Sequence, residues 1–358
     1  MKIWQPVVDV GAGYLFSLSD SLSLTEEKYP GILSPVEDGD LVIASDYSGQ
    51  HKEATHEAYS FLVTTDLALS EWLPLLREFR ERCLPDGRRI SFKKLSEPVR
   101  WRALPAFLET ASRLSGNLIT VLVDRRVGSF IDGGPKTAIE VFPDCFPQGT
   151  RHGTAEKMLR LASFLALILS GLRRENQAST WISDHDETLD SHEKREGFAR
   201  LATYLTFGLT RWRNAADHVF GTTESPAAPY WSEDVAALAD LAAGAYCQMS
   251  SHLPAFLGKE TWQVLVATGD IESRARTIGD WLATGDCALK HVLLRLEPDD
   301  YGEVRSSAQA FAGSICNLHE ARKQTSPLDD LRTRVRSVDF HRVLTHRFHL
   351  NLTHPETA

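Results

Sequence analysis

Apolar residues along the chain occur either in short runs or at helical spacing, and this pattern predicts an α/β protein. The short runs are rich in β-branched and aromatic residues and are bounded by Gly, Pro, Asn or Asp, which is typical of strands. They predict strands over residues 41–44, 56–65, 88–95, 117–124, 178–184 and 218–220. Longer segments between them have apolar residues three or four positions apart, which predicts helices. These helices are expected over residues 69–84, 99–114, 155–174, 193–207 and 233–250.

Strands that alternate with helices predict a mixed sheet flanked by helices, with a hairpin at its start. Residues 1–38 contain several Gly and Pro breakers and predict an irregular arm with one or two short strands. From about residue 255 the pattern is helical only. Candidate helices there are residues 261–267, 272–282, 291–296 and 306–323. The chain is therefore expected to have three parts: an N-terminal arm (1–38), an α/β domain (39–254) and a helical C-terminal appendage (255–358).

The first predicted strand runs into an aspartate. Residues 41–44 are apolar at every position, which indicates a strand buried on both faces. Asp46 follows this run, and Gly49 indicates a turn three positions later. A core strand that ends in this way can hold a carboxylate over a site. A surface aspartate that caps the turn is the alternative interpretation.

Three further acidic residues occupy comparable positions. Asp184 and Asp186 follow the strand at residues 178–184 and are two positions apart, so in an extended chain they point to the same side. Asp240 lies in an alanine-rich helix whose small residues allow it to approach the sheet closely. A charged side chain in such a helix is costly to bury unless it is paired or binds a metal. An exposed polar face on the helix is the alternative.

Composition narrows the class of protein. Of the 358 residues, 42% are hydrophobic and 24% are charged, as in a soluble globular protein. The formal net charge of −9 argues against a broad basic surface that binds nucleic acid without selection, although a local basic groove remains compatible with it. Five scattered cysteines and the lack of a signal-peptide pattern predict a cytoplasmic protein with reduced thiols and no membrane segment.

Several motifs, in order, resemble a large family of uncharacterised prokaryotic proteins that is regarded as having a ribonuclease-H-like fold. The segment Asp46-Tyr-Ser-Gly49 is similar to the Asp-Glu-Ser-Gly opening of that family. Phe92-Lys-Lys-Leu-Ser96 follows the hairpin, and Trp181-Ile-Ser-Asp-His-Asp-Glu187 comes after a long apolar helix. Ala236-Ala-Leu-Ala-Asp-Leu-Ala-Ala-Gly244 is similar to the closing helix of the family. The resemblance covers about residues 38 to 252.

The sequence departs from the family at two positions. Tyr47 stands where the family has its second acidic residue, so one possible ligand is missing. The glutamine of the closing helix is replaced by alanine in Ala236-Ala237. Glu53, Glu57 and Glu187 are candidates to replace the acid that is missing at Tyr47.

The resemblance implies a divalent-metal site and a nuclease. Asp46, Asp184 or Asp186, and Asp240 would hold Mg²⁺ or Mn²⁺, because their oxygens are hard ligands. The metal would activate a water molecule for hydrolysis of a phosphodiester in DNA or RNA. Lys93 or Lys94 would contact a phosphate. The alternative function is a catalytically degenerate ribonuclease-H-like module that binds nucleic acid or a protein partner, including a second copy of the chain.

Overall fold

A computed structural model describes residues 2–7, 13–51, 53–184, 186–210, 217–224, 231–250, 262–265, 271–284, 287–311 and 345–350. In these ranges all strands belong to one sheet, with the order β5-β4-β1-β2-β3-β7-β8-β9-β6. The strands are β1 (Leu41–Ser48), β2 (His56–Thr65), β3 (Gly116–Asp124), β4 (Ser179–Ser183), β5 (His218–Thr222), β6 (Trp262–Leu265), β7 (Leu289–Pro298), β8 (Val304–Phe311) and β9 (Thr345–Leu350). A mixed α/β sheet was predicted, and this part of the prediction is confirmed.

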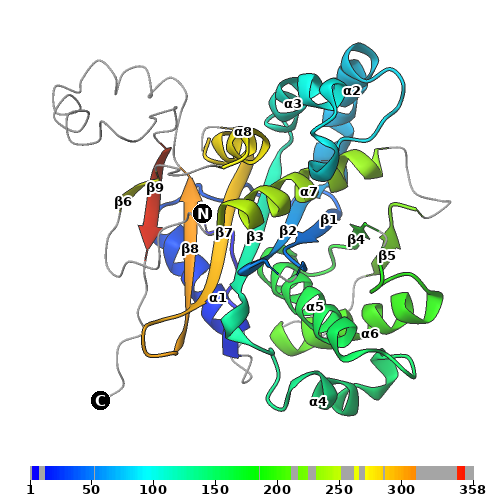
Figure 1. Ribbon diagram of the computed structural model, residues 1–358, viewed down its shortest axis with the longest axis vertical. Coiled ribbons are helices and arrows are strands. Elements are labelled where there is room, and N and C mark those ends of the chain that lie inside the picture. The colour runs from blue at the N-terminus through cyan, green and yellow to red at the C-terminus, as the bar shows by residue number, and fades with distance from the viewer. Residues whose placement is uncertain are drawn as a thin grey trace.

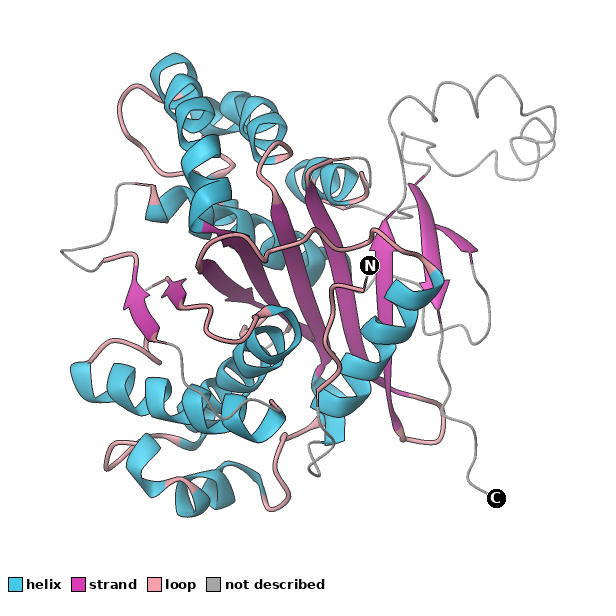
Figure 2. Ribbon diagram, turned by 180° about the vertical axis from the view of Figure 1, so that it is seen from behind, coloured by secondary structure: helices cyan, strands magenta, loops and turns pink. Residues whose placement is uncertain are grey.

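Helices cover both faces of this sheet (Figures 1 and 2). The α-helices are α1 (Gly13–Lys28), α2 (Asp66–Cys83), α3 (Pro98–Ala111), α4 (Gly134–Val141), α5 (His152–Leu172), α6 (His192–Leu209), α7 (Ser232–Met249) and α8 (Ser273–Leu282). Within the described ranges there are also three single-turn 3-10 helices, η1 (Phe92–Lys94), η2 (Arg125–Val127) and η3 (Pro143–Cys145).

The strands at the centre of the sheet determine where their ends meet. β1 is parallel to β4, and β4 is parallel to β5, whereas β2 is antiparallel to both β1 and β3. β3 in turn is parallel to β7. It follows that β1, β3, β4, β5 and β7 all run in one direction, and their C-terminal ends lie along one edge of the sheet. We call this edge the carboxyl edge.

Side chains alternate between two cores along β1. Leu41 and Ile43 belong to the core beneath α1, α5 and α6, whereas Val42 and Ala44 belong to the core beneath α2, α3, α7 and α8. Figure 1 shows α7 and α8 across the front of the sheet, and Figure 2 shows α1 and α5 on the opposite side. Both faces of the strand are buried, as its uninterrupted apolar run predicts.

The small residues of α7 allow it to lie close to the sheet, as predicted. The helix packs across β1, β2 and β3. Ala239, Ala242 and Ala243 are all buried. At Gly244 an added Cβ would overlap the ring of Phe92, so only glycine lets η1 pack directly on the helix. The loop that carries η1 is thereby held against α7.

Two local predictions before residue 100 are wrong. The N-terminal arm contains a helix, α1, whose buried Leu15, Leu18 and Leu22 have helical spacing among serines. The strand expected over residues 88–95 is a loop followed by η1. Ile90 and Phe92 are buried as an alternating pattern implies. However, the backbone N–H of Phe92 donates to Asp240 rather than to a neighbouring strand.

The predicted helical appendage is also wrong in the ranges that the structure describes. Residues 289–298 and 304–311 form β7 and β8, an antiparallel pair, and β7 continues the sheet from β3 across the predicted boundary at residue 254. Residues 262–265 are β6, and only the helix at residues 272–282 is found, as α8. Residues 312–323 of the last candidate helix lie outside the described residues. A short apolar run does not distinguish a strand from a buried helical turn, which explains the error at 291–296.

None of the described helices is long and apolar enough to span a bilayer.

Candidate active site

Four of the five parallel strands carry an acidic residue at the carboxyl edge. Asp46 lies two positions before the end of β1, Asp124 ends β3, Asp184 follows β4 directly, and Glu297 is the penultimate residue of β7. In open α/β sheets, ligands bind beyond the carboxyl ends of parallel strands. This edge is therefore where a functional site is expected, and the four acids divide into two groups.

Asp46 lies on the face of β1 that α7 covers. Strand alternation places it with Val42 and Ala44, and its Oδ1 accepts a hydrogen bond of 2.6 Å from the backbone N–H of Tyr47. Burial, followed by repulsion from Asp240 and Asp184, raises the pKa of Asp46 well above its ordinary value. The Asp46 carboxylate is therefore both withdrawn from water and close to two like charges, and the Tyr47 N–H and Arg89 offset these effects only in part.

Asp240 is the second member of this group, which we call the acidic cluster (Asp46, Asp184 and Asp240). Its Oδ2 accepts a hydrogen bond of 2.8 Å from the N–H of Phe92. Burial raises the pKa of Asp240, although the hydrogen bonds from Phe92 and Ser91 and the charge of Arg89 oppose the increase. The side chain is therefore not part of an exposed polar face, which was the alternative interpretation.

Asp184 completes the acidic cluster and is the member with a direct ion pair. Its Oδ1 is 2.9 Å from Nη2 of Arg89 and accepts a hydrogen bond of 3.2 Å from the hydroxyl of Thr223, just beyond β5. Sequence reasoning missed Arg89. The Arg88-Arg89 pair precedes the alternating Ile90 and Phe92, and the mistaken strand prediction placed it away from the acids.

Asp186 does not join the acidic cluster, although the sequence pattern placed it beside Asp184. The chain turns over residues 187–189, and Asp186 forms an ion pair with Lys157 of α5 and accepts a hydrogen bond of 2.9 Å from the N–H of Thr188. Burial tends to raise the pKa of Asp186, but the hydrogen bonds from Lys157, Thr188 and Tyr47 outweigh it and lower the pKa. Asp184 and Asp186 therefore face different partners, and the expectation that they point to the same side is wrong.

Tyr47 points to the opposite face of the sheet from Asp46. It packs against the core beneath α5, with the Nζ of Lys157 4.3 Å from the centre of its ring. An acid at position 47 would also point to that face. Glu57 lies there too, where it pairs with Arg160 and accepts a hydrogen bond of 2.7 Å from Tyr59. The tyrosine thus removes no carboxylate from the acidic cluster.

The predicted phosphate ligands lie beside the cluster on η1. Lys93 and Lys94 are exposed, and they follow Phe92, whose N–H is bonded to Asp240. The contact between Phe92 and Gly244 anchors this turn on α7. The two lysines therefore project from a fixed turn at the border of the acidic cluster.

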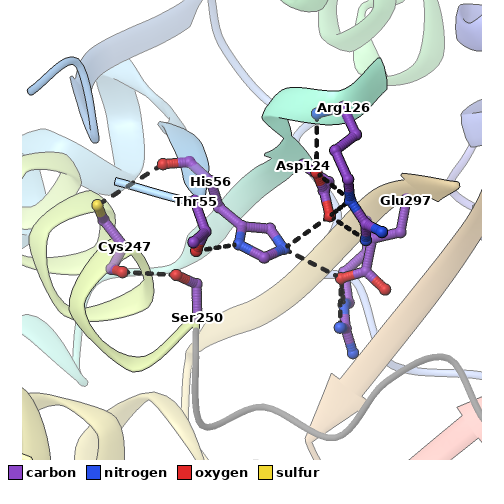
Figure 3. Close-up of polar contacts among 8 residues, drawn as sticks. Thr55, His56, Asp124, Arg126, Cys247, Ser250 and Glu297 are labelled. Carbon is purple, nitrogen blue, oxygen red and sulfur yellow. Dashed lines mark hydrogen bonds and ion pairs between the residues drawn. The ribbon is translucent and has the colours of Figure 1, made fainter. Parts of the chain in front are cut away.

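The other two edge acids form a separate group, the His56 cluster (His56, Asp124, Arg126, Arg295 and Glu297). Figure 3 shows both carboxylates on the Nε2 side of the His56 ring, with Thr55 on the opposite side. Its Nε2 is 3.8 Å from Oδ2 of Asp124 and 3.5 Å from Oε1 of Glu297. Arg126 Nη2 is 2.6 Å from Asp124, and Arg295 Nε is 2.8 Å from Glu297. Every acid in this group has a cationic partner.

Because of these cationic partners, the pKa values of Asp124 and Glu297 are lowered, whereas those of Asp46 and Asp240 are raised. Burial tends to raise the pKa of Asp124, but hydrogen bonds from Arg126 outweigh it and lower the pKa. For Glu297, burial is likewise outweighed, by His56 and Arg295. The His56 cluster joins β2, β3 and β7 and lies against the end of α7 at Cys247 and Ser250 (Figure 3).

The acidic cluster has donors that suit a divalent cation. Its oxygens come from β1, the end of β4 and α7, and such hard ligands favour Mg²⁺ or Mn²⁺. As the side chains lie, no group of three or more His, Cys, Asp or Glu residues in the described ranges is arranged to hold a metal ion. The donor types fit a divalent metal by their chemistry, whereas their present arrangement does not, and Arg89 engages Asp184, one of the three.

Comparisons with protein-family models and with curated protein sequences find no match for this chain.

Proposed function

We propose that this protein is a ribonuclease-H-like, divalent-metal-dependent phosphodiester hydrolase that acts on DNA or RNA. The order β3-β2-β1-β4-β5, with β2 antiparallel to its neighbours, is the arrangement expected of a ribonuclease-H-like sheet. α5, α6 and α7 follow β3, β4 and β5 along the chain, as that fold requires. In such folds the metal ligands come from the first strand, a later strand and a terminal helix, which correspond here to Asp46, Asp184 and Asp240. This fold-level analogy supports the proposal, and the chemistry rests on the site.

The proposal depends on one observation, which is that Asp46 of β1, Asp184 at the end of β4 and Asp240 of α7 lie close enough to repel one another. Burial, and then repulsion from Asp240 and Asp184, raises the pKa of Asp46, and such a site is unfavourable for the folded protein unless a cation compensates it. Perturbed pKa values of this kind cluster at functional sites. A bound Mg²⁺ or Mn²⁺ would supply Lewis acidity and a metal-activated water for attack on phosphorus. The three aspartates would hold the cation.

The exposed lysines indicate how a polyanionic substrate would be oriented. Lys93 and Lys94 lie next to the acidic cluster and would contact phosphates that flank the scissile one. Because the chain has a net charge of −9, attraction to nucleic acid has to be local. We expect binding to weaken steeply as salt is added.

Isothermal titration calorimetry with Mn²⁺ tests the proposal, on the wild-type protein, Asp46→Ala and Asp186→Asn. Asp186 is a matched control, because it is a part-buried aspartate of the same region that is engaged by Lys157 outside the cluster. We expect Mn²⁺ to bind the wild type and Asp186→Asn equally and to lose at least about 100-fold in affinity for Asp46→Ala. Mn²⁺-dependent cleavage of single-stranded, duplex or hybrid substrates should follow the same order. Equal loss in both variants would contradict the proposed ligand set.

A second function is favoured by one observation. Arg89 forms an ion pair with Asp184. This pairing would be expected if the arginine side chain had replaced the metal as the cation of the cluster. The protein would then be a binding module with the same fold, for nucleic acid or a protein partner. Absence of Mn²⁺ binding to the wild type, together with salt-dependent binding of an oligonucleotide without cleavage, would select this function.

A further inference from the structure

Arg89 is held at the acidic cluster by the main chain of its own loop. Its carbonyl oxygen accepts a hydrogen bond of 2.7 Å from Nε of Arg100 in α3. The carbonyl of Arg88 accepts one of 2.7 Å from Nη1 of Arg80 in α2, which also pairs with Asp234 of α7. Phe92, three residues after Arg89, is bonded to Asp240. The backbone that carries Arg89 is thus held by three helices, α2, α3 and α7.

The guanidinium itself is only partly satisfied. Nη2 is 2.9 Å from Asp184, whereas Nε is buried and has no hydrogen-bond partner in the part of the chain that the structure describes. The positive charge of Arg89 also opposes the raised pKa of both Asp46 and Asp240. One cation therefore serves three carboxylates, and one of its donors is left without an acceptor.

We infer that Arg89 is an exchangeable counter-ion, which pairs with Asp184 in the metal-free protein and binds a substrate phosphate when a divalent metal takes over Asp184. This inference rests on the proposed function. A guanidinium and a divalent cation compete for the same negative charge, so each must weaken the binding of the other. Once released from the carboxylate, the planar fork of an arginine suits two oxygens of a phosphate better than a lysine does. The donor without a partner would then gain an acceptor.

A purely structural arginine would behave differently. If Arg89 only anchored its loop, its removal would loosen the link from Phe92 to Asp240 and weaken metal binding. If Arg89 competes with the metal, its removal must strengthen metal binding. The sign of the change in Mn²⁺ affinity therefore separates the two roles.

The test compares Mn²⁺ dissociation constants of the wild type, Arg89→Met and Arg88→Met by calorimetry at constant ionic strength. Arg88 is the matched control: it is the preceding arginine and pairs with Asp86 and Glu97 instead of the cluster. We expect Arg89→Met to bind Mn²⁺ at least about tenfold more tightly than the wild type, and Arg88→Met to match the wild type. Arg89→Lys, which retains the charge, should lie between them and serves in place of Arg89→Met if that variant does not fold.

The phosphate contact has its own readout. With saturating Mn²⁺, we expect Arg89→Met to bind a fluorescent single-stranded oligonucleotide about tenfold more weakly than the wild type. The slope of log K against log salt should decrease in magnitude by about 0.7, as for one lost phosphate contact. Unchanged oligonucleotide affinity would overturn this half of the inference.

The outcomes for Mn²⁺ distinguish this inference from the proposed function. If the wild type binds Mn²⁺ and Arg89→Met binds it no more tightly, the counter-ion role is overturned and the metal-dependent function stands. If only Arg89→Met binds, competition by Arg89 is supported and the wild-type protein is the binding module. If no variant binds Mn²⁺, both the inference and the metal-dependent function are overturned.

Discussion

The acidic cluster and the His56 cluster lie on the same face and the same edge of one sheet, yet the pKa values of their acids are shifted in opposite directions. Asp124 and Glu297 have lowered pKa values because arginines and His56 outweigh their burial. Asp46 and Asp240 have raised pKa values, since burial and mutual repulsion exceed what Arg89 supplies. Position at the edge is therefore not sufficient to make an acid a functional candidate.

The difference lies in the number of cations. The His56 cluster has an arginine for each acid, so its charges are balanced, and we interpret it as a structural link between β2, β3 and β7. The acidic cluster has one arginine for three acids. A fold retains such an imbalance at a cost in stability, which is typical of sites that bind a charged ligand. The predictions below test this contrast.

The largest effect on stability is expected in the His56 cluster. Glu297→Gln removes the carboxylate that forms an ion pair with Arg295, whose side chain is 4% exposed. Removing one member of a buried ion pair costs about 3 kcal/mol in the free energy of unfolding. Urea denaturation followed by circular dichroism measures this change, and Mn²⁺ affinity should equal that of the wild type.

Glu303→Gln provides the control for this prediction. Glu303 is an exposed acid in the turn between β7 and β8, and its removal should change the free energy of unfolding by less than about 0.5 kcal/mol. Should the two variants prove equally stable, Glu297 would have no structural role. A loss of Mn²⁺ affinity in Glu297→Gln would instead make the two clusters one site.

A smaller effect of opposite sign is expected in the acidic cluster. Asp46→Asn removes a charge that is buried and repelled by Asp240 and Asp184 while it preserves the shape of the side chain. We expect the metal-free protein to become more stable by about 1 kcal/mol, and Mn²⁺ binding to be lost. The same denaturation experiment, run in a chelating buffer, measures the gain. A variant less stable than the wild type would show that the cluster is already compensated.

The sequence predicts the parts of this site that depend on local patterns. An uninterrupted apolar run locates β1, and β-branched and aromatic residues locate β4. The small residues around Asp240 predict the close approach of α7. These features are enough to expect Asp46, Asp184 and Asp240 near one another. They do not place Asp186, because a spacing of two residues predicts a shared side only for an extended chain and carries no information on the pairing of Asp186 with Lys157.

The remaining features depend on tertiary contacts that leave no local pattern. His56 meets partners from β3 and β7, and nothing in its neighbourhood distinguishes it from a histidine at a strand end. Arg89 reaches Asp184, 95 positions later, from a loop whose alternating residues resemble a strand. β7 contains a short apolar run that fits either strand or helix, and its pairing with β3 and β8 decides the outcome.

The smallest effect, and the one most specific to the contrast, is the pH dependence of the two variants. A lowered folded pKa, as for Glu297, adds stability that is present above the unfolded value of about 4.3 and is lost as pH falls through the folded pKa. For Asp46 the folded pKa is raised, so ionisation of this group lowers the free energy of unfolding. The full loss is present above the folded pKa, and no loss is present below the unfolded pKa of about 3.9. At pH 7 we expect Glu297→Gln to have a lower free energy of unfolding than the wild type and Asp46→Asn to have a higher one. Both differences should become smaller as the pH is lowered from 7 to 3. Urea midpoints at several pH values provide the measurement. At pH 7 the two variants should differ from the wild type in opposite directions. If both were less stable than the wild type, or both more stable, the charges of the two clusters would be balanced in the same way. The acidic cluster would then no longer be a candidate ligand site.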